Sequence, residues 1–596
     1  MSHFLRKLLL TVTLTASLAA SPHDFEVDGI YYNIISSTEN TVCVTHKGSS
    51  PSSYSNEYTG TVVIPPSVEF NGTTYSVNAI GPYAFCYRRG LTSVTIPNSV
   101  TSIEQVAFAN CNGLKSVHIN SLDSWCEISF GDYNANPLTS AHHLFLNGEE
   151  IKNLQVPGSI TYIKDYTFSG CSGLTSVTIP NSVTSIGNSA FSGCSELKSV
   201  HINSLDSWCE ILFGDYSANP LTSAHHLFLN GEEIKNLLVP ESISSINDYA
   251  FSGCSGLTSV TIPNTVVSIG EEAFSRCRNL SNLLIESGSG TLSFVHCDLL
   301  NFFYDCPLEN VHIGRNLSYY TNQNLESPFS HHENLTNLTI GKMVTQIRDH
   351  AFYECSGLKK LLIEDSPETL SLGSDNPYPS NIFYNCPLET VHIGRNLSYR
   401  TDYPPFRNRK ELMNLTIGNT VTRIGAYAFD GCSKLKSIEI PPSVTEIGTR
   451  GFGNCNNFNL IKLKSPNLIL GDECFKSCTE VIKMESYAEI PPECYYQALS
   501  SVNKSLCKLY VPKGCGDKYR EAYQWMEFEN IYDTLDPVAG VDELTADTED
   551  SIVDVFDVSG ICVKHSVHYD ALRQLLSPGL YIVRTLDGKV KKVIIK

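Results

Sequence analysis

The sequence lacks the motifs that mark the common catalytic sites. Among its 596 residues there is no H-E-x-x-H, no G-x-x-x-x-G-K-[ST], no G-x-S-x-G and no C-x-x-C. These patterns gather zinc ligands, cradle phosphates, expose a serine nucleophile or form a redox pair. Because no other cluster of polar residues replaces them, we expect a protein that is not an enzyme and that uses no metal or cofactor.

Charge is also scarce, and one sign predominates. Only 17% of the residues are charged, and 62 Asp and Glu outnumber 42 Lys and Arg, so the formal net charge is -20. Such a surface repels phosphate backbones and anionic lipids, which argues against nucleic acid as a partner and against peripheral membrane binding. Apolar residues still make up 42% of the chain, enough for a large packed core.

Long apolar runs are missing except at the beginning of the chain. Arg6 and Lys7 precede an apolar run from Leu8 to Leu18, and small residues follow it. This arrangement predicts a signal peptide over residues 1–20, since the run is shorter than the roughly 20 residues of a membrane span. We therefore expect a secreted or outer-cell-surface protein without membrane insertion after signal removal.

Internal repetition dominates the remaining sequence. Phenylalanines recur at a spacing of 23 positions, as between Phe168 and Phe191. The segment from Ser116 recurs 83 positions later from Ser199, and the block from Phe303 returns 80 positions later from Phe383. The periodicity predicts a stack of similar units, and we expect the long duplicated blocks to add turns without interrupting it.

A single unit shows what the stack requires. In "LTSVTIP" the apolar Val177 and Ile179 alternate with polar residues and predict a short strand with one buried face. "SVTSI" predicts a second extended segment, and Gly187 marks a turn. Phe191 and Cys194 are expected to fill the core. One unit cannot bury its own apolar face, so copies must share a continuous core.

The repeated pattern L-x-x-V-x-I-P-x-x-V-x-x-I-G-x-x-A-F-x-x-C resembles the BspA-type leucine-rich repeat of bacterial surface proteins, and it covers roughly Ile64 to Pro512. The resemblance implies a β-rich, right-handed leucine-rich-repeat solenoid with short strands and little helix. It also implies adhesion, with a host extracellular matrix protein or a bacterial surface protein as partner. A structural cell-envelope protein without a specific ligand, and an accessory protein that handles a glycan, remain alternatives.

The ends of the chain differ from the repeats. The hairpin signals Asp28-Gly29 and Asn71-Gly72 predict an N-terminal β cap over residues 21–80. The solenoid is expected over residues 81–531, sealed by a short amphipathic helix because Tyr519, Ala522, Trp525 and Phe528 have helical spacing.

An acidic segment at residues 532–550 predicts a linker, and residues 551–596 predict a small β domain. Residues 578–583 (PGLYIV) and Gly588 of this domain resemble the C-terminal sorting domain of bacterial type IX secretion. The resemblance implies sorting to the cell surface, although this copy is shorter than is usual for the family. A plain β appendage is the alternative.

Cysteine and histidine occur in patterns that do not indicate metal sites. Of the 21 cysteines, eleven lie three residues after a phenylalanine, one repeated position where cysteine acts as a small buried apolar residue. Disulfides between neighbouring turns remain an alternative. Cys474 and Cys478 have no nearby partner ligands for zinc. The pairs His142-His143, His225-His226 and His331-His332 favour structural or surface roles, because adjacent side chains on a strand face opposite sides.

One position of each strand predicts a binding face. The polar residue between the two inward positions forms an extended outward row, the kind of surface on which repeat proteins bind partners. The alternative is that threonine merely suits an exposed strand position. The candidate residues are Thr95, His118, Thr178, His201, Thr261, His312, Thr339, His392 and Thr416, with Glu439 beyond them. Candidate aromatic anchors are Trp125, Tyr133, Trp208 and Tyr216, with core positions in the longer units as the alternative.

Overall fold

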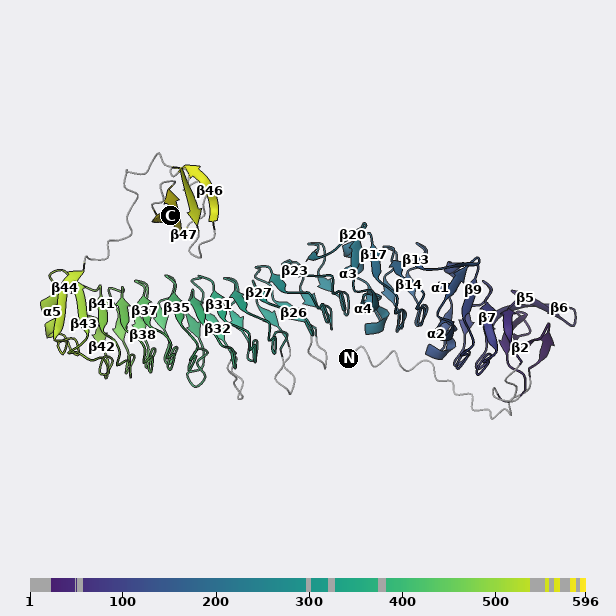
Figure 1. Ribbon diagram of the computed structural model, residues 1–596, viewed down its shortest axis with the longest axis horizontal. Helices are drawn as coiled ribbons and strands as arrows, with labels where there is room; N and C mark the ends of the chain where they lie inside the picture. The colour runs from purple at the N-terminus through teal and green to yellow at the C-terminus, as the bar shows by residue number, and fades with distance from the viewer. Residues whose placement is uncertain are drawn as a thin grey trace.

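The computed structural model describes residues 23–48, 50, 57–295, 302–319, 327–373, 382–535, 552–556, 562–568, 579–585 and 590–595. The predicted signal peptide lies outside these residues, as does most of the predicted linker. The described part of the repeat region is an elongated β-solenoid of about 18 turns (Figure 1). The predicted leucine-rich-repeat solenoid with little helix is therefore confirmed.

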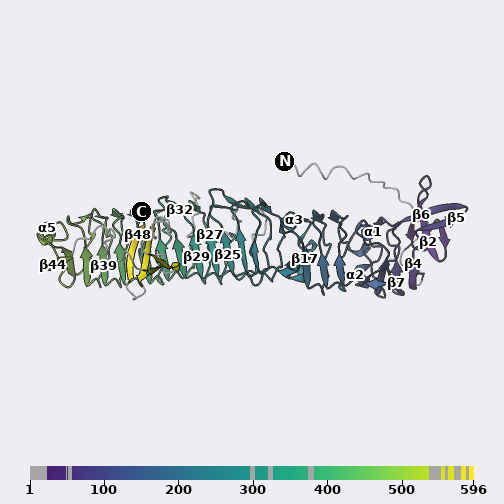
Figure 2. The ribbon, with the colours of Figure 1, turned by 90° about the horizontal axis from the view of Figure 1, so that it is seen from above.

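A typical turn contributes two strands, as predicted for "LTSVTIP" and "SVTSI". The longer strands of successive turns pair in parallel and form four sheets, two of which also end in a short antiparallel strand; we call these sheets the long-strand series. Figure 2 shows several of them side by side along the length of the solenoid. In chain order the four sheets contain β4 (Gly60–Val63), β7 (Leu91–Thr95), β9 (Ser116–Ile119), β11 (Leu144–Leu146) and β12 (Glu149–Glu150); β13 (Asn153–Gln155), β15 (Ser176–Thr178), β17 (Ser199–Ile202), β19 (Leu227–Leu229) and β20 (Glu232–Glu233); β21 (Asn236–Leu238), β23 (Ser259–Ile262), β25 (Asn282–Ile285), β27 (Asn310–Ile313), β29 (Asn337–Ile340), β31 (Lys360–Ile363), β33 (Thr390–Ile393) and β35 (Asn414–Ile417); and β37 (Ser437–Ile440), β39 (Leu460–Leu463), β41 (Lys483–Ser486), β43 (Lys508–Pro512) and β44 (Asn530–Leu535).

The second strand of each turn is only two or three residues long. These strands also pair in parallel and form the short-strand series. They are β8 (Ser102–Ile103) and β10 (Ser129–Phe130); β14 (Tyr162–Ile163), β16 (Ser185–Ile186) and β18 (Leu212–Phe213); β22 (Ser245–Ile246), β24 (Ser268–Ile269), β26 (Leu292–Phe294) and β28 (Leu317–Ser318); β30 (Gln346–Ile347), β32 (Leu370–Leu372) and β34 (Leu397–Ser398); and β36 (Arg423–Ile424), β38 (Glu446–Ile447), β40 (Ile469–Leu470) and β42 (Glu493–Cys494).

The N-terminal cap is built from antiparallel hairpins that lead into both series. Asp28 and Gly29 have φ angles of 49° and 79°, and Asn71 and Gly72 have 50° and 73°, as the two predicted hairpin turns require. The cap strands are β1 (Phe25–Val27), β2 (Ile30–Ser36), β3 (Thr41–Thr45), β5 (Ser67–Phe70) and β6 (Thr73–Ile80). β6 pairs with β8, whereas β4 pairs with β7, so the cap and the first turn share residues 60–80.

The core of the solenoid contains a column of phenylalanine rings. From Phe251 to Phe475 ten rings stack one per turn, with centroids 5.3 to 5.9 Å apart. Each ring covers the next, so a turn buries its apolar face only when its neighbours are present.

The two long duplicated blocks carry most of the helical residues. They contain α1 (Leu122–Cys126), α2 (Leu138–Ala141), α3 (Leu205–Cys209), α4 (Leu221–Ala224) and the short 3-10 helices η1 (Tyr133–Ala135) and η2 (Tyr216–Ala218). The prediction that these blocks leave the stack uninterrupted is wrong for the backbone ladder. β12 folds back antiparallel on β11, and β20 on β19, so each hairpin occupies the sheet edge and the next strand starts a new sheet.

Side chains bridge these two junctions instead. The buried Asn136 donates from Nδ2 to the Tyr166 and Thr167 carbonyls at 2.6 and 3.3 Å, and its Oδ1 accepts from the Leu138 amide at 2.9 Å. Asn219 repeats the arrangement with Tyr249, Ala250 and Leu221. The core therefore continues across each junction although the strands do not.

Two details at the C-terminal end correct the sequence predictions. The helix α5 (Gly516–Glu521) is shorter than the spacing of Tyr519 to Phe528 predicted, because Trp525 enters the core from a turn and Phe528 from the residue that follows this turn. The last strand, β44, runs to Leu535, past the predicted solenoid boundary at residue 531, because it pairs with β43.

The C-terminal segment forms a sheet of its own. Its strands are β45 (Ile552–Phe556), β46 (Cys562–His568), β47 (Gly579–Thr585) and β48 (Val590–Ile595), all antiparallel in the order β46-β45-β47-β48. Gly579 to Val583 of the sorting-domain resemblance lie on β47, and Pro578 and Gly588 lie outside the described residues.

Candidate binding face

The register of the long-strand series places one outward residue of each turn in a row. We call this set the strand-face row. Its members pair directly across neighbouring strands and are Val63, Thr95, His118 and Phe145 in the first sheet; Gln155, Thr178, His201 and Phe228 in the second; Leu238, Thr261, Leu284, His312, Thr339, Leu362, His392 and Thr416 in the third; and Glu439, Lys462, Glu485, Tyr510 and Tyr532 in the fourth.

All nine threonine and histidine candidates therefore occupy one structural position. Eight are partly exposed and Thr416 is exposed. The row is continuous only within each sheet, because the β11/β12 and β19/β20 hairpins and the end of the third sheet at β35 separate its parts. The structure thus brings the predicted residues together in groups, and not in a single ladder.

The structure adds apolar members that the search for polar residues missed. Leu238 is 64% exposed, and Leu284 and Leu362 are each 39% exposed. The sequence could have identified these leucines, because each lies between the two inward-facing residues of its strand, at the same position as the candidate threonines. A shallow hollow of about 290 Å³ surrounds Leu284, Thr261, His312 and Thr339 on the same sheet.

Aromatic pairs lie on the row at the two duplicated blocks. The ring of His118 stacks on Phe145 with centroids 4.7 Å apart, and His201 stacks on Phe228 at 4.9 Å. Serine hydroxyls lie 3.0 Å from His118 Nε2 and 2.9 Å from His201 Nε2, so both rings are held from two sides. These pairs present rigid aromatic surface at two equivalent places.

The fourth sheet is charged. Glu485 lies 2.6 Å from Lys483 and 3.8 Å from Lys462, and Glu439 lies 2.6 Å from Lys464. Burial opposes ionisation of Glu485, but hydrogen bonds from Lys483 and Tyr487 and the nearby Lys462 hold its pKa below the ordinary value. Glu439, Lys462 and Glu485 are therefore paired charges, and the stacked rings of Tyr510 and Tyr532, 5.2 Å apart, follow them in the row.

Two of the four predicted aromatic anchors are core residues. Trp125 and Trp208 are each 1% exposed, and their indole N–H groups donate to the Thr167 and Ala250 carbonyls at 3.1 and 2.9 Å. A buried indole with a satisfied N–H holds the block together and is closed to a partner. Tyr133 on η1 is exposed, and Tyr216 on η2 is partly exposed beneath Arg276, at 4.5 Å.

Comparison with known proteins assigns the family. The family described as "BspA type Leucine rich repeat region (6 copies)" matches residues 78–142, 139–219, 222–301, 325–404 and 402–505. The chain belongs to the BspA-type leucine-rich-repeat family. No protein of curated function matches it in sequence.

Several solved structures are similar to this BspA-type protein. A leucine-rich repeat protein from Bacteroides ovatus is 23% identical, with 82% of this chain and 100% of that chain covered and a TM-score of 0.36. A leucine rich cell surface protein from Faecalibacterium prausnitzii is 22% identical over 78% of this chain and 95% of that chain, with a TM-score of 0.28.

The cysteines of the BspA-type repeat are structural in the described turns. In successive turns the thiol points at the phenylalanine carbonyl of the turn before, as Cys194 does at Phe168 (3.3 Å) and Cys455 at Phe429 (3.3 Å). Burial raises the pKa of Cys171 and Cys432 to about 12. The nineteen cysteines whose side chains the structure describes are free thiols, so the disulfide alternative is not realised among them.

The histidine pairs also have local partners. His142 Nδ1 lies 3.0 Å from the Gly170 carbonyl, His143 lies 2.6 Å from Glu150, and His331 lies 3.2 Å from Glu354. Within the described ranges no group of three or more histidine, cysteine or acidic side chains is placed to hold a metal ion.

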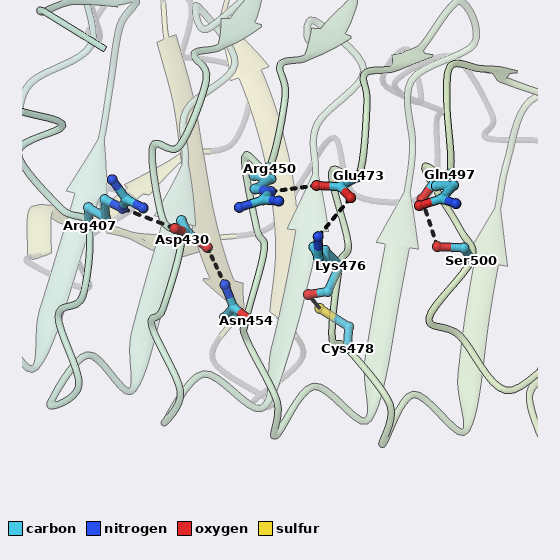
Figure 3. Close-up of polar contacts among 9 residues, drawn as sticks. All are labelled: Arg407, Asp430, Arg450, Asn454, Glu473, Lys476, Cys478, Gln497 and Ser500. Carbon is cyan, nitrogen blue, oxygen red and sulfur yellow. Dashed lines mark hydrogen bonds and ion pairs between the residues drawn. The ribbon is translucent and has the colours of Figure 1, made fainter. Parts of the chain in front are cut away.

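A second column of polar residues follows the turns near the C-terminal end (Figure 3). Asp430 joins Arg407 at 3.0 Å to Asn454 at 2.7 Å, and Glu473 joins Arg450 to Lys476 at 2.7 Å. The bonds from Arg407, Asn454 and Arg450 reach a neighbouring turn, so they favour the native register of the stack. In this column each acidic side chain is paired with a basic one, Asp430 with Arg407 and Glu473 with Arg450 and Lys476, so these charges are already engaged within the protein.

Proposed function

We propose that this BspA-type protein is a secreted or cell-surface adhesin that binds another protein through the strand-face row. The partner class we propose is a host extracellular matrix protein or a bacterial surface protein. Leucine-rich-repeat solenoids commonly bind proteins and are typically non-enzymatic. None of the described helices has the length and apolar composition of a bilayer span.

One observation carries the proposal. Three leucines stand exposed on the third sheet, at the position where neighbouring turns have threonine or histidine. Full burial of a fully exposed leucine side chain is worth about 1.5–3 kcal/mol, and these leucines, 39% to 64% exposed, can contribute a part of that on binding. Of the three, Leu284 also lines the hollow of about 290 Å³. Exposed apolar side chains grouped on one face are typical of interaction sites.

The test uses binding of the full secreted chain to immobilised matrix proteins and to bacterial surface proteins. Leu238→Asp should weaken saturable binding at least tenfold, because it places a charge within the apolar part of the row. Leu212→Asp is the matched control: Leu212 is 63% exposed but lies on β18 of the short-strand series. Equal effects of both changes, or no saturable binding to any protein, would refute the proposal.

We further propose that the C-terminal sheet acts as a sorting domain. The support is the motif resemblance along β47 and its separate four-stranded fold. Cleavage-coupled sorting predicts that the mature surface protein has lost Lys596. Mass spectrometry of the exported protein measures this, and an intact C-terminus would contradict it.

A further inference from the structure

Two corners of the solenoid are one residue shorter than the others. In ordinary turns two residues separate the core cysteine from the next core leucine, as between Cys171 and Leu174. In the duplicated "CPL" blocks a single proline separates Cys306 from Leu308, and Cys386 from Leu388. All these cysteines and leucines are buried, so the missing residue is lost from the surface of the corner.

Both shortened corners are hollow. The first hollow has a volume of about 700 Å³ and lies between Arg278 of the preceding turn, Tyr304–Pro307, and Ser330–Asn334 of the following turn. The second, of about 350 Å³, includes Cys386, Pro387 and Leu388. Volumes of roughly 300–1,000 Å³ are typical of sites for small ligands; both hollows fall in this range, and the first has twice the space of the second.

The charges around the larger hollow are largely paired. Arg278 Nε lies 2.8 Å from Asp305 Oδ2, and His331 Nδ1 lies 3.2 Å from Glu354 Oε2. Burial lowers the pKa of His332 to about 4, so its ring is neutral at pH 7. Among the lining residues Glu333 is a further acid, so a phosphate or carboxylate ligand finds no surplus positive charge.

The polar and aromatic groups that line the larger hollow suit a neutral ligand with many hydroxyls. Tyr304 is 50% exposed, and the amide of Asn334 also lines the hollow. Asp305 and Ser330 add a carboxylate and a hydroxyl that already bond to Arg278 and Ser327. A sugar ring packs its C–H face against an aromatic ring while its hydroxyls bond to such groups. We propose that the corner at residues 304–308 binds a neutral oligosaccharide. None of its lining residues belongs to the strand-face row, so the site is independent of the proposed protein partner.

The test begins with the full secreted chain on an array of neutral and acidic oligosaccharides. Calorimetric titration then uses the neutral oligosaccharide that gives the strongest array signal. Tyr304→Ala should weaken its binding roughly tenfold through loss of the stacking surface. Insertion of one glycine between Pro307 and Leu308 restores the ordinary corner length and should abolish binding, with circular dichroism confirming that the fold is kept.

Tyr384→Ala is the matched control. Tyr384 occupies the equivalent position of the second block and is 51% exposed, but its ring already stacks on Tyr353 at 4.9 Å and does not line the second hollow. Neutral binding that Tyr304→Ala weakens and Tyr384→Ala keeps supports the site. Binding of acidic oligosaccharides alone, binding unaffected by Tyr304→Ala, or no binding overturns it. Leu238→Asp is tested by protein binding and Tyr304→Ala by oligosaccharide binding, so the proposed protein site and the proposed oligosaccharide site can be refuted independently.

Discussion

Asn136 offers a sharp test of how the stack crosses a long block. It is fully buried, and its side chain makes three hydrogen bonds at the place where the strand ladder is broken. Replacement by alanine removes all three. The Tyr166 carbonyl still accepts from the Ser169 amide at 2.8 Å, and the Thr167 carbonyl from Trp125 at 3.1 Å. The Leu138 amide loses its acceptor.

The expected cost follows from this difference. A buried N–H without a partner costs about 1–3 kcal/mol, and each of the two other bonds contributes about 0.5–1 kcal/mol because its carbonyl keeps another donor. We therefore expect Asn136→Ala to lower the free energy of unfolding by about 3 kcal/mol. Asn134→Ala, two residues away at an exposed position, should change it by less than about 0.5 kcal/mol.

Urea unfolding followed by tryptophan fluorescence measures the effect. Trp125 is a local probe, since it donates to the same Thr167 carbonyl as Asn136. Asn219→Ala should give an equal loss, because the second block repeats the contacts. If the protein unfolds as one unit, the losses of unfolding free energy caused by the two distant substitutions should add in the double variant. Two separate unfolding transitions would instead indicate that each junction unfolds locally.

A loss below about 1 kcal/mol for Asn136→Ala would refute the reasoning, since the unpaired Leu138 amide alone should cost that much. Unequal losses at Asn136 and Asn219 would show that sequence outside the duplicated contacts decides junction stability.

Three further predictions concern the core, the thiols and the ion pairs. Trp208→Ala should lower the free energy of unfolding by about 3–5 kcal/mol, whereas Tyr133→Ala should leave the unfolding midpoint unchanged. Unchanged stability of Trp208→Ala would mean that Trp208 is not a core residue and could contact a partner. The thiols of Cys171 and Cys432 should not react with a thiol reagent at pH 8 before unfolding, because burial raises their pKa to about 12. Denatured protein without reductant should show close to 21 reactive thiols, and a much lower count would mean disulfides. Hydrogen bonds from Lys476 and Arg450 hold the pKa of Glu473 below its ordinary 4.5, so its stabilisation is present above that pH and is lost as the pH falls further. The hydrogen-exchange protection factors of residues 446–476, corrected for the intrinsic exchange rate at each pH, should fall on acidification, and less so in Glu473→Gln. An equal fall in both proteins would exclude Glu473 as the cause.

The periodic pattern was enough to predict the architecture of the repeat region. Val177 and Ile179 had to face a core because a 23-residue unit cannot bury them alone, and Phe191 and Cys194 followed from the same spacing. The two N-terminal hairpins were also predictable, because Asp-Gly and Asn-Gly accept positive φ angles that other pairs resist. These features depend on local conformational preference and on the burial of periodic apolar residues, and both can be inferred from the order of residue types along the chain.

The tertiary structure decided what depends on contacts between distant residues. Whether Trp125 is an anchor or a core residue depends on the Thr167 carbonyl 42 positions away. The break in the ladder depends on β12 reaching the edge of β11 before β13 does, which no single unit encodes. The face of Leu238 and the hollow at Tyr304 exist only where several turns meet, because a repeated unit specifies its own buried side and its neighbours create the surface.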